Sequence, residues 1–175
     1  MAISEYAAQA QLAYEKGDFA TAADLYKKAA DEALLRSDTL TSAEMNNNRC
    51  VALLKSGDAL SAYEAVQGSD AIFAAAGDIQ RQALALGNLG AVHEALGNNE
   101  QAIAAYQMSA DLLTKTGDQE SRGFVLKSLS ALQSKTGKHL QAIVSMQEAL
   151  NCQKHLSPQE QALKKLLHHS LRMLR

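Results

Sequence analysis

The chain has 175 residues, which suits one domain of ordinary size. Aromatic residues make up only 5% of it and tryptophan is absent; this composition argues against a sandwich or barrel of strands and favours an all-α protein. The formal net charge of −2 excludes the strongly basic field that gathers nucleic acid, although residues 1–40 carry four Lys/Arg against seven Asp/Glu and residues 138–175 carry six against two.

Glycine divides the chain with a period of 40 residues, at Gly17, Gly57, Gly97 and Gly137. A second set of turn residues alternates with these glycines, at Ser37-Asp38, Gly77-Asp78, Gly117-Asp118 and Ser157-Pro158. The segments between the turns have apolar side chains at helical spacing. The sequence therefore predicts four helix pairs, at about residues 3–42, 43–82, 83–122 and 123–156, within a single domain that spans residues 1–175.

Within each pair, the period also predicts how the two helices begin, end and meet. The loop glycine supplies a left-handed turn that ends the first helix, and the aspartates of the second turn cap the helix that follows, at Asp38, Asp78 and Asp118. Small residues let the paired helices approach closely, namely Ala10 with Ala22, Cys50 with Ala62, Gly90 with Ala102 and Ser130 with Ala142. In the second repeat, Gly68 falls inside a predicted helix and marks a point of local irregularity.

The last segment, residues 158–175, is predicted to be a capping helix. Ser157 is its expected N-cap, Pro158 its first residue and Glu160 the reciprocal capping side chain. Its leucines form one stripe, at Leu163, Leu166, Leu167, Leu171 and Leu174, and its basic side chains lie mostly elsewhere, at Lys164, Lys165, His168, His169, Arg172 and Arg175. We expect the leucines to cover the fourth repeat and to close a stack with a continuous core.

These features resemble the tetratricopeptide repeat (TPR) family. The resemblance is strongest in the third repeat, through Leu86–Gly90, Leu96-Gly97 and Ala102–Tyr106. The 40-residue form with Gly-Asp in the loop is similar to the repeats of spindle-orientation adaptors and kinesin light chains. The resemblance implies a right-handed α-solenoid whose first helices line a concave groove, and a protein-interaction scaffold or adaptor that binds a linear peptide or a partner helix.

The resemblance also implies which side chains line that groove: Gln11, Tyr14, Asn47, Asn48, Val51, Lys55, Leu84, Asn88, Glu94, Phe124, Lys127 and Lys135. Asn48 and Asn88 are the main candidates, because they lie 40 residues apart and an amide side chain both donates to and accepts from a peptide backbone. The alternative is that these asparagines bridge neighbouring helices. Lys127 and Lys135 would attract an acidic segment, or would simply be solvated.

Other functions find less support in the sequence. Cys152, His155, His168 and His169 raise the alternative of a metal site, but His168 lies roughly 15 Å along the next helix from the loop, so we expect neither metal nor cofactor. No phosphate-binding loop or nucleophile motif occurs, so we expect no enzyme. Two cysteines without a disulfide pattern, and no secretion signal or long apolar run, favour a cytoplasmic protein.

Two alternatives to a peptide-binding module stay open. The chain would self-associate as a homo-oligomer if a terminal helix docked into another copy, or it would be the repeat segment of a larger multidomain protein. Membrane contact through the basic side of the last helix is not expected, because that helix has no Trp or Phe anchor.

Overall fold

The computed structural model describes residues 2–173, with side chains as far as residue 169. Over this range it contains ten helices and no strand, which confirms the all-α prediction. The first five are α1 (Ile3–Glu15), α2 (Phe19–Leu35), α3 (Thr39–Ser56), α4 (Ala59–Val66) and α5 (Ser69–Ala75). The other five are α6 (Ile79–Ala95), α7 (Asn99–Thr116), α8 (Gln119–Lys135), α9 (His139–Cys152) and α10 (Pro158–Met173).

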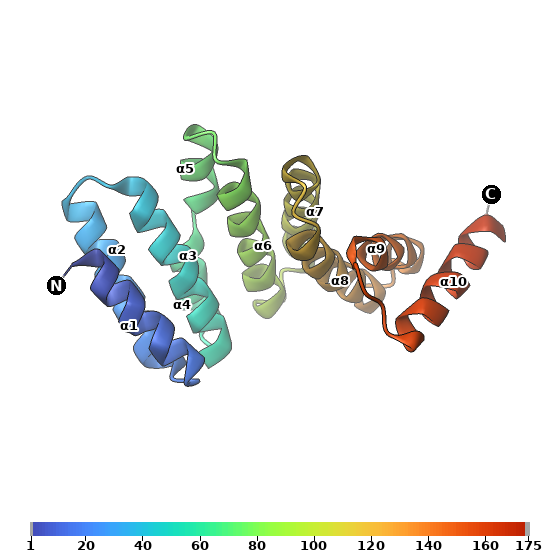
Figure 1. Cartoon of the computed structure of the whole chain (residues 1–175), viewed down its shortest axis with the longest axis horizontal. Helices are drawn as coiled ribbons and strands as arrows, with labels where there is room; N and C mark the ends of the chain where they lie inside the picture. The colour runs from blue at the N-terminus through green and yellow to red at the C-terminus, as the bar shows by residue number, and fades with distance from the viewer. Residues whose placement is uncertain (1, 174–175) are drawn as a thin grey trace.

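The helices stack in chain order along one axis, with the two ends of the chain at opposite ends of the molecule (Figure 1). Neighbours in sequence pack on one another except α4 and α5, which both pack on α3 and α6 instead. Buried apolar side chains run through the stack from Ala10 in α1 to Cys152 in α9. This is the predicted solenoid, in which each unit contacts only its neighbours.

The turns between helices follow the sequence prediction. The four glycines of the 40-residue period have φ between 77° and 85°, the left-handed region in which a side chain is strained. Asp38, Asp78 and Asp118 accept hydrogen bonds from the third amide of the following helix at 3.0, 2.9 and 3.0 Å. These bonds lower the pKa of each carboxyl. Asp18 and Asp58 cap α2 and α4 in the same way, which the sequence prediction had not included.

The small residues predicted to pair are all buried, and a hydrogen bond joins the pair in the fourth repeat. The Ser130 hydroxyl donates to the carbonyl oxygen of Ala142 at 2.7 Å. At Gly90, a Cβ atom would lie 2.6 Å from the Tyr106 ring, so glycine is what allows α6 and α7 to approach this closely. Burial raises the pKa of the Cys50 thiol to about 12, which fits a core residue and not a nucleophile.

The second repeat is irregular at the glycine that the sequence marked. The predicted second helix is divided into α4 and α5, and Gly68 between them has φ 80°. The break leaves Phe73 fully buried in α5. The second repeat therefore contains three helices, and the prediction of a simple helix pair is wrong there.

The last helix, α10, begins as predicted, but its leucine side does not pack on the fourth repeat as predicted. The Ser157 amide and hydroxyl both donate to Glu160 Oε2, at 3.0 and 2.9 Å, which confirms the reciprocal cap. However, Leu163 and Leu166 are 38% and 66% exposed, so the prediction that the leucine stripe covers the fourth repeat is wrong for these two side chains. The side of the helix that lines a hollow against α9 instead carries polar and basic residues: Gln161, Lys164, Lys165, His168 and His169. The side chains of Leu171, Arg172, Leu174 and Arg175 lie outside the described residues.

Candidate functional site

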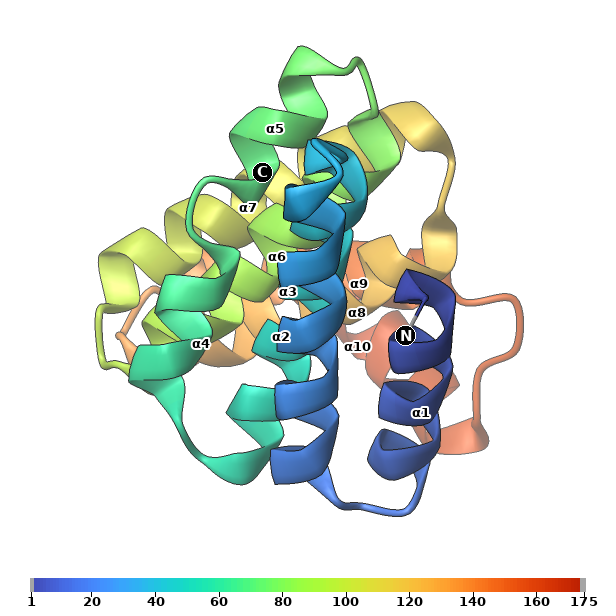
Figure 2. The ribbon, with the colours of Figure 1, turned by 90° about the vertical axis from the view of Figure 1, so that its left-hand side faces the viewer.

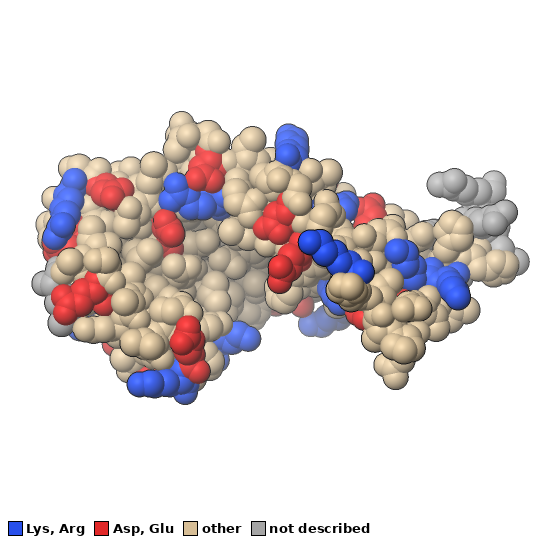
Figure 3. Space-filling view, in the orientation of Figure 1, with Lys and Arg blue, Asp and Glu red and all other residues tan. Residues whose placement is uncertain are grey.

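The first helices of the repeats, α1, α3, α6 and α8, carry all the predicted site residues, and their shared side is called here the first-helix face. α3 packs on α6, and α6 contacts α8. In Figure 1, α1, α3 and α6 lie nearer the viewer than α4 and α7, and the turned view of Figure 2 agrees. In Figure 3 the middle of this side carries few charged side chains, with Lys, Arg, Asp and Glu around its rim.

Three half-buried asparagines lie at the centre of this face. Asn88 Nδ2 in α6 donates to Asn47 Oδ1 in α3 at 2.9 Å, so the two amides bridge neighbouring helices. This bridge is the alternative that the sequence left open for Asn88. Asn48, one residue along α3, makes no side-chain hydrogen bond within the described part of the chain. The Asn48 amide, both N–H donors of Asn47, and the oxygen and second N–H donor of Asn88 are therefore available to another molecule.

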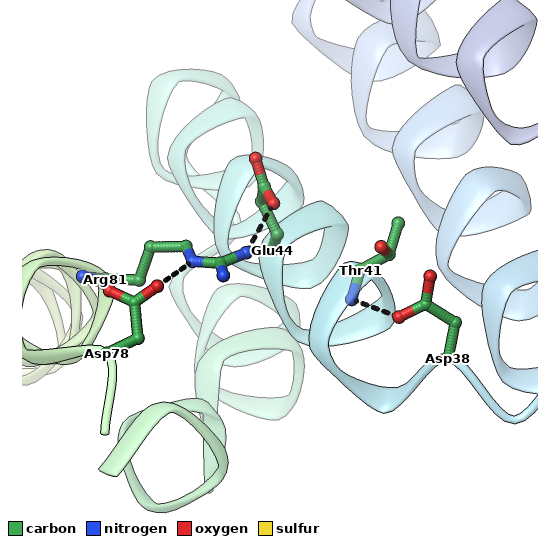
Figure 4. Close-up of polar contacts among 5 residues, drawn as sticks. All are labelled: Asp38, Thr41, Glu44, Asp78 and Arg81. Carbon is green, nitrogen blue, oxygen red and sulfur yellow. Dashed lines mark hydrogen bonds and ion pairs between the residues drawn. The ribbon is translucent and has the colours of Figure 1, made fainter. Parts of the chain in front are cut away.

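Sequence reasoning missed a charged network that links the start of α6 to α3 (Figure 4). Arg81 at the start of α6 reaches back to Glu44 of α3, with 2.9 Å between Nη1 and Oε2, and its Nε donates to Asp78 Oδ2 at 2.7 Å. The guanidinium also lies 5.2 Å from the centre of the Phe73 ring. The bond to Asp78 is the main reason that the pKa of Arg81 is raised. No repeat signal indicated Arg81, because the equivalent positions are Thr41 and Ser121.

Two predicted site residues are held by tyrosines of the second helices. The Tyr26 hydroxyl donates to Gln11 Oε1 at 3.0 Å, and the Tyr106 hydroxyl donates to Glu94 Oε2 at 2.9 Å. Burial raises the pKa of both phenols, so both remain protonated donors at neutral pH. These bonds fix the direction of Gln11 and Glu94 on the first-helix face.

Two predicted residues at the C-terminal end of the face, Phe124 and Lys127, border a hollow of about 690 Å³ between α8 and the loop after α9. Phe124 lines it with 74% of its surface exposed. Lys127, which also lines it, pairs with Glu160 of α10 at 3.3 Å.

The other predicted site residues lie outside this hollow. Tyr14 packs edge to face on Phe19, with 5.2 Å between ring centres. The remaining predicted residues are half-buried at Val51 and Leu84 and exposed at Lys55 and Lys135.

Comparison with known proteins bears on the repeats directly. Residues 81–155, which span α6 to α9, match the family model of the tetratricopeptide repeat. This match identifies tetratricopeptide repeats in that part of the chain. Repeats of this family generally mediate protein–protein interactions and typically bind protein partners. No curated protein matches the sequence of the chain.

The described residues bring together no three His, Cys, Asp or Glu side chains that would hold a metal ion. Cys152 is buried and receives a hydrogen bond from Arg122 at 3.3 Å, whereas His155 is exposed in the loop. Among the described helices, none is long and apolar enough to cross a membrane. What the first-helix face does offer is hydrogen-bonding amides at Asn47, Asn48 and Asn88 beside half-buried Val51 and Leu84.

Proposed function

We propose that this chain is an adaptor that holds a linear peptide or a partner helix along the first-helix face, with the centre of the site at Asn47, Asn48 and Asn88. The observation that carries the proposal is the half-buried amide of Asn48, which makes no side-chain hydrogen bond within the described part of the chain. It lies one residue from the Asn47–Asn88 hydrogen bond, which holds two further amide groups side by side between α3 and α6. An extended peptide presents donors and acceptors in alternation, which amide side chains match whatever the peptide sequence.

The surroundings support a protein ligand. Half-buried Val51 and Leu84 supply limited apolar contact beside the amides, and the Arg81–Glu44 pair at the rim is already neutralised. Phe124 adds an exposed aromatic ring further along the face, and such rings contribute strongly to peptide interfaces. We further propose that the four repeats act as one cytoplasmic domain without catalytic activity of its own.

The test uses peptides selected from a random library for binding to the wild-type protein. We expect Asn48→Ala with Asn88→Ala to weaken binding of a selected peptide by about tenfold or more, because each lost hydrogen bond is worth about 0.5–1.5 kcal/mol. Fluorescence anisotropy measures the affinity, and circular dichroism checks that the helices remain.

The matched control is Asn98→Ala with Gln107→Ala, which removes two exposed amides at the start of α7 and along it. The control variant is expected to bind like the wild type. Equal binding by the wild type and the Asn48/Asn88 variant would place the ligand elsewhere and reject the proposed centre.

A self-associating assembly is the second candidate, and the exposure of Leu163 on α10 favours it. Exposed apolar side chains on an amphipathic helix are typical of an interface. Light scattering over a concentration series distinguishes the two functions. A monomer at every concentration eliminates self-assembly, and a dimer that dissociates on Leu163→Glu would support it.

A further inference from the structure

The inward side of α10 is basic, contrary to the leucine side that the sequence pattern favoured. Gln161, Lys164, Lys165, His168 and His169 follow the spacing of one helical face. They line a hollow of about 770 Å³ whose other wall is formed by Gln147, Asn151 and Leu156. Gln147 Nε2 and His168 Nδ1 approach to 3.4 Å across it. The hollow is separate from the first-helix face, because it is formed by α9, α10 and the loop between them.

No carboxylate lines this hollow among the described residues. The nearest acidic residues of α9 and α10 are engaged elsewhere: Glu148 pairs with Arg122, and Glu160 pairs with Lys127 and Ser157. Lys164 and Lys165 have no ion-pair partner within the described side chains. Two lysines and two histidines thus converge with three amide side chains, and all of them can donate hydrogen bonds.

We propose that the hollow between α9 and α10 binds an acidic peptide segment, a run of Asp or Glu side chains in a partner protein. The cations would attract the segment, and the amides of Gln147, Asn151 and Gln161 would complete its hydrogen bonds. An anionic membrane fits less well, because the basic side chains face α9 across a hollow, and no Trp, Tyr or Phe among the described residues lines it. Single-stranded nucleic acid fits less well because these residues offer its bases no Trp, Tyr or Phe ring to stack on.

The probe is a fluorescein-labelled hexaglutamate peptide, with a hexaglutamine peptide of the same length as its control. Anisotropy is measured with the full chain at low salt, about 50 mM, where screening is weak. We expect the wild type to bind hexaglutamate and not hexaglutamine. Lys164→Gln with Lys165→Gln should weaken binding by about five- to tenfold, the loss that two solvent-accessible ion pairs contribute.

The chain offers a matched control in Lys27 and Lys28, an adjacent lysine pair on exposed α2 positions. Lys27→Gln with Lys28→Gln changes the net charge by the same amount and is expected to leave the affinity within about twofold. In a second measurement on the wild type, amide NMR shifts of residues 147–169 should move on addition of hexaglutamate, and those of residues 20–35 should stay.

Three results would overturn the proposal. If the Lys164/Lys165 variant and the Lys27/Lys28 variant weaken hexaglutamate binding equally, the peptide responds to net charge alone. No binding of hexaglutamate, or shift changes confined to residues outside 147–169, removes the site. Binding of phosphatidylserine vesicles that depends on Lys164 and Lys165, without binding of hexaglutamate, assigns the basic face to a membrane. The Asn48/Asn88 variant serves as a further control, because loss of the groove site would leave this one intact.

Discussion

The α6–α7 pair and the α9–α10 pair use similar apolar patterns but bury them differently. Between α6 and α7, Gly90 lies against the Tyr106 ring, Ser109 donates to the Ala83 carbonyl at 2.7 Å, and Leu113 is fully buried. Between α9 and α10, basic and amide side chains line a hollow, and Leu163 is 38% exposed. The comparison teaches that an amphipathic pattern predicts a helix, but the packing against its neighbours decides which side it buries.

The largest expected difference between the α6–α7 and α9–α10 pairs is in the stability lost when a leucine is replaced by alanine. Leu113→Ala should lower the free energy of unfolding by about 3 kcal/mol, since it leaves a cavity at a fully buried position. Leu163→Ala removes the same atoms from a partly exposed position and should cost less than about 1 kcal/mol. Urea denaturation measures both. Similar losses for the two variants would mean that α10 buries its leucines as the sequence predicted.

The close approach of α6 and α7 gives the next largest effect. Gly90→Ala places a Cβ atom 2.6 Å from the Tyr106 ring, and such overpacking costs about 1–3 kcal/mol. This exceeds the gain of about 1 kcal/mol that alanine brings to a helix interior, so the variant should be less stable than the wild type by thermal denaturation.

Gly87→Ala on the same helix is the control for this substitution. Its Cβ atom would meet the Ser109 hydroxyl at 3.2 Å and Val125 at 3.4 Å, contacts that a small side-chain shift relieves. The gain in helix propensity should then offset the contact, and stability should stay within about 0.5 kcal/mol of the wild type. A Gly90→Ala protein as stable as the Gly87→Ala protein would contradict the tight α6–α7 contact.

The Tyr106–Glu94 hydrogen bond predicts a smaller effect with a distinct pH dependence. Tyr106→Phe should cost about 1 kcal/mol at neutral pH. The pKa of Tyr106 is raised above its ordinary value of 10.0, mainly by burial. Above pH 10 the unfolded chain therefore loses this proton while the folded chain keeps it, and the stability of the wild type falls as pH rises.

The variant should lose less stability than the wild type in this alkaline range. Tyr63→Phe provides the comparison, because the Tyr63 hydroxyl has no hydrogen-bond partner in the described structure. Urea midpoints at pH 7 and above pH 10 give both quantities. An identical alkaline loss in the wild type and the Tyr106→Phe protein would rule out the contribution of the buried phenol.

The fold was predictable where one local cause decides the geometry. Glycines with positive φ, aspartate caps and small facing residues recur every 40 residues, so each position supports the others. Gly68 also marked its own break, because it has φ 80°, a left-handed backbone conformation that glycine adopts without strain and an α-helix does not contain. The direction of α10 was not predictable, since both sides of an amphipathic helix satisfy the sequence and only contacts with α8 and α9 distinguish them.

The candidate site was predictable only in outline. The family pattern placed Asn47 and Asn88 on one face, but it did not specify which amide would bond to which. That choice depends on the distance between α3 and α6, which the Arg81–Glu44 pair also spans. Arg81 itself carries no repeat signal, and its contact with Glu44 joins two helices that are brought together only by folding.

The smallest effect on stability, and the most local, concerns the attachment of α10. Lys127→Gln removes the pair with Glu160 and should leave the melting temperature within about 1 °C, because both side chains are partly exposed. It should nevertheless speed amide hydrogen exchange in residues 158–169 without affecting α7. Lys135→Gln, an exposed lysine on the same helix, should change neither region.

The cap of α10 at Glu160 should also make the stability of this helix depend on pH in the acid range. The pKa of Glu160 is lowered from 4.5, first by the hydrogen bonds from Ser157 and then by Lys127. The ionised Glu160 carboxylate therefore stabilises the start of α10 at pH values above 4.5, the ordinary pKa, and this stabilisation is lost as the pH falls through the lowered pKa of the folded protein. In the Lys127→Gln protein the loss should begin at higher pH, because one contribution to the low pKa is gone. If exchange in α10 responds to acid no earlier than exchange in α7, α10 is held by apolar packing and the contrast between the two pairs disappears.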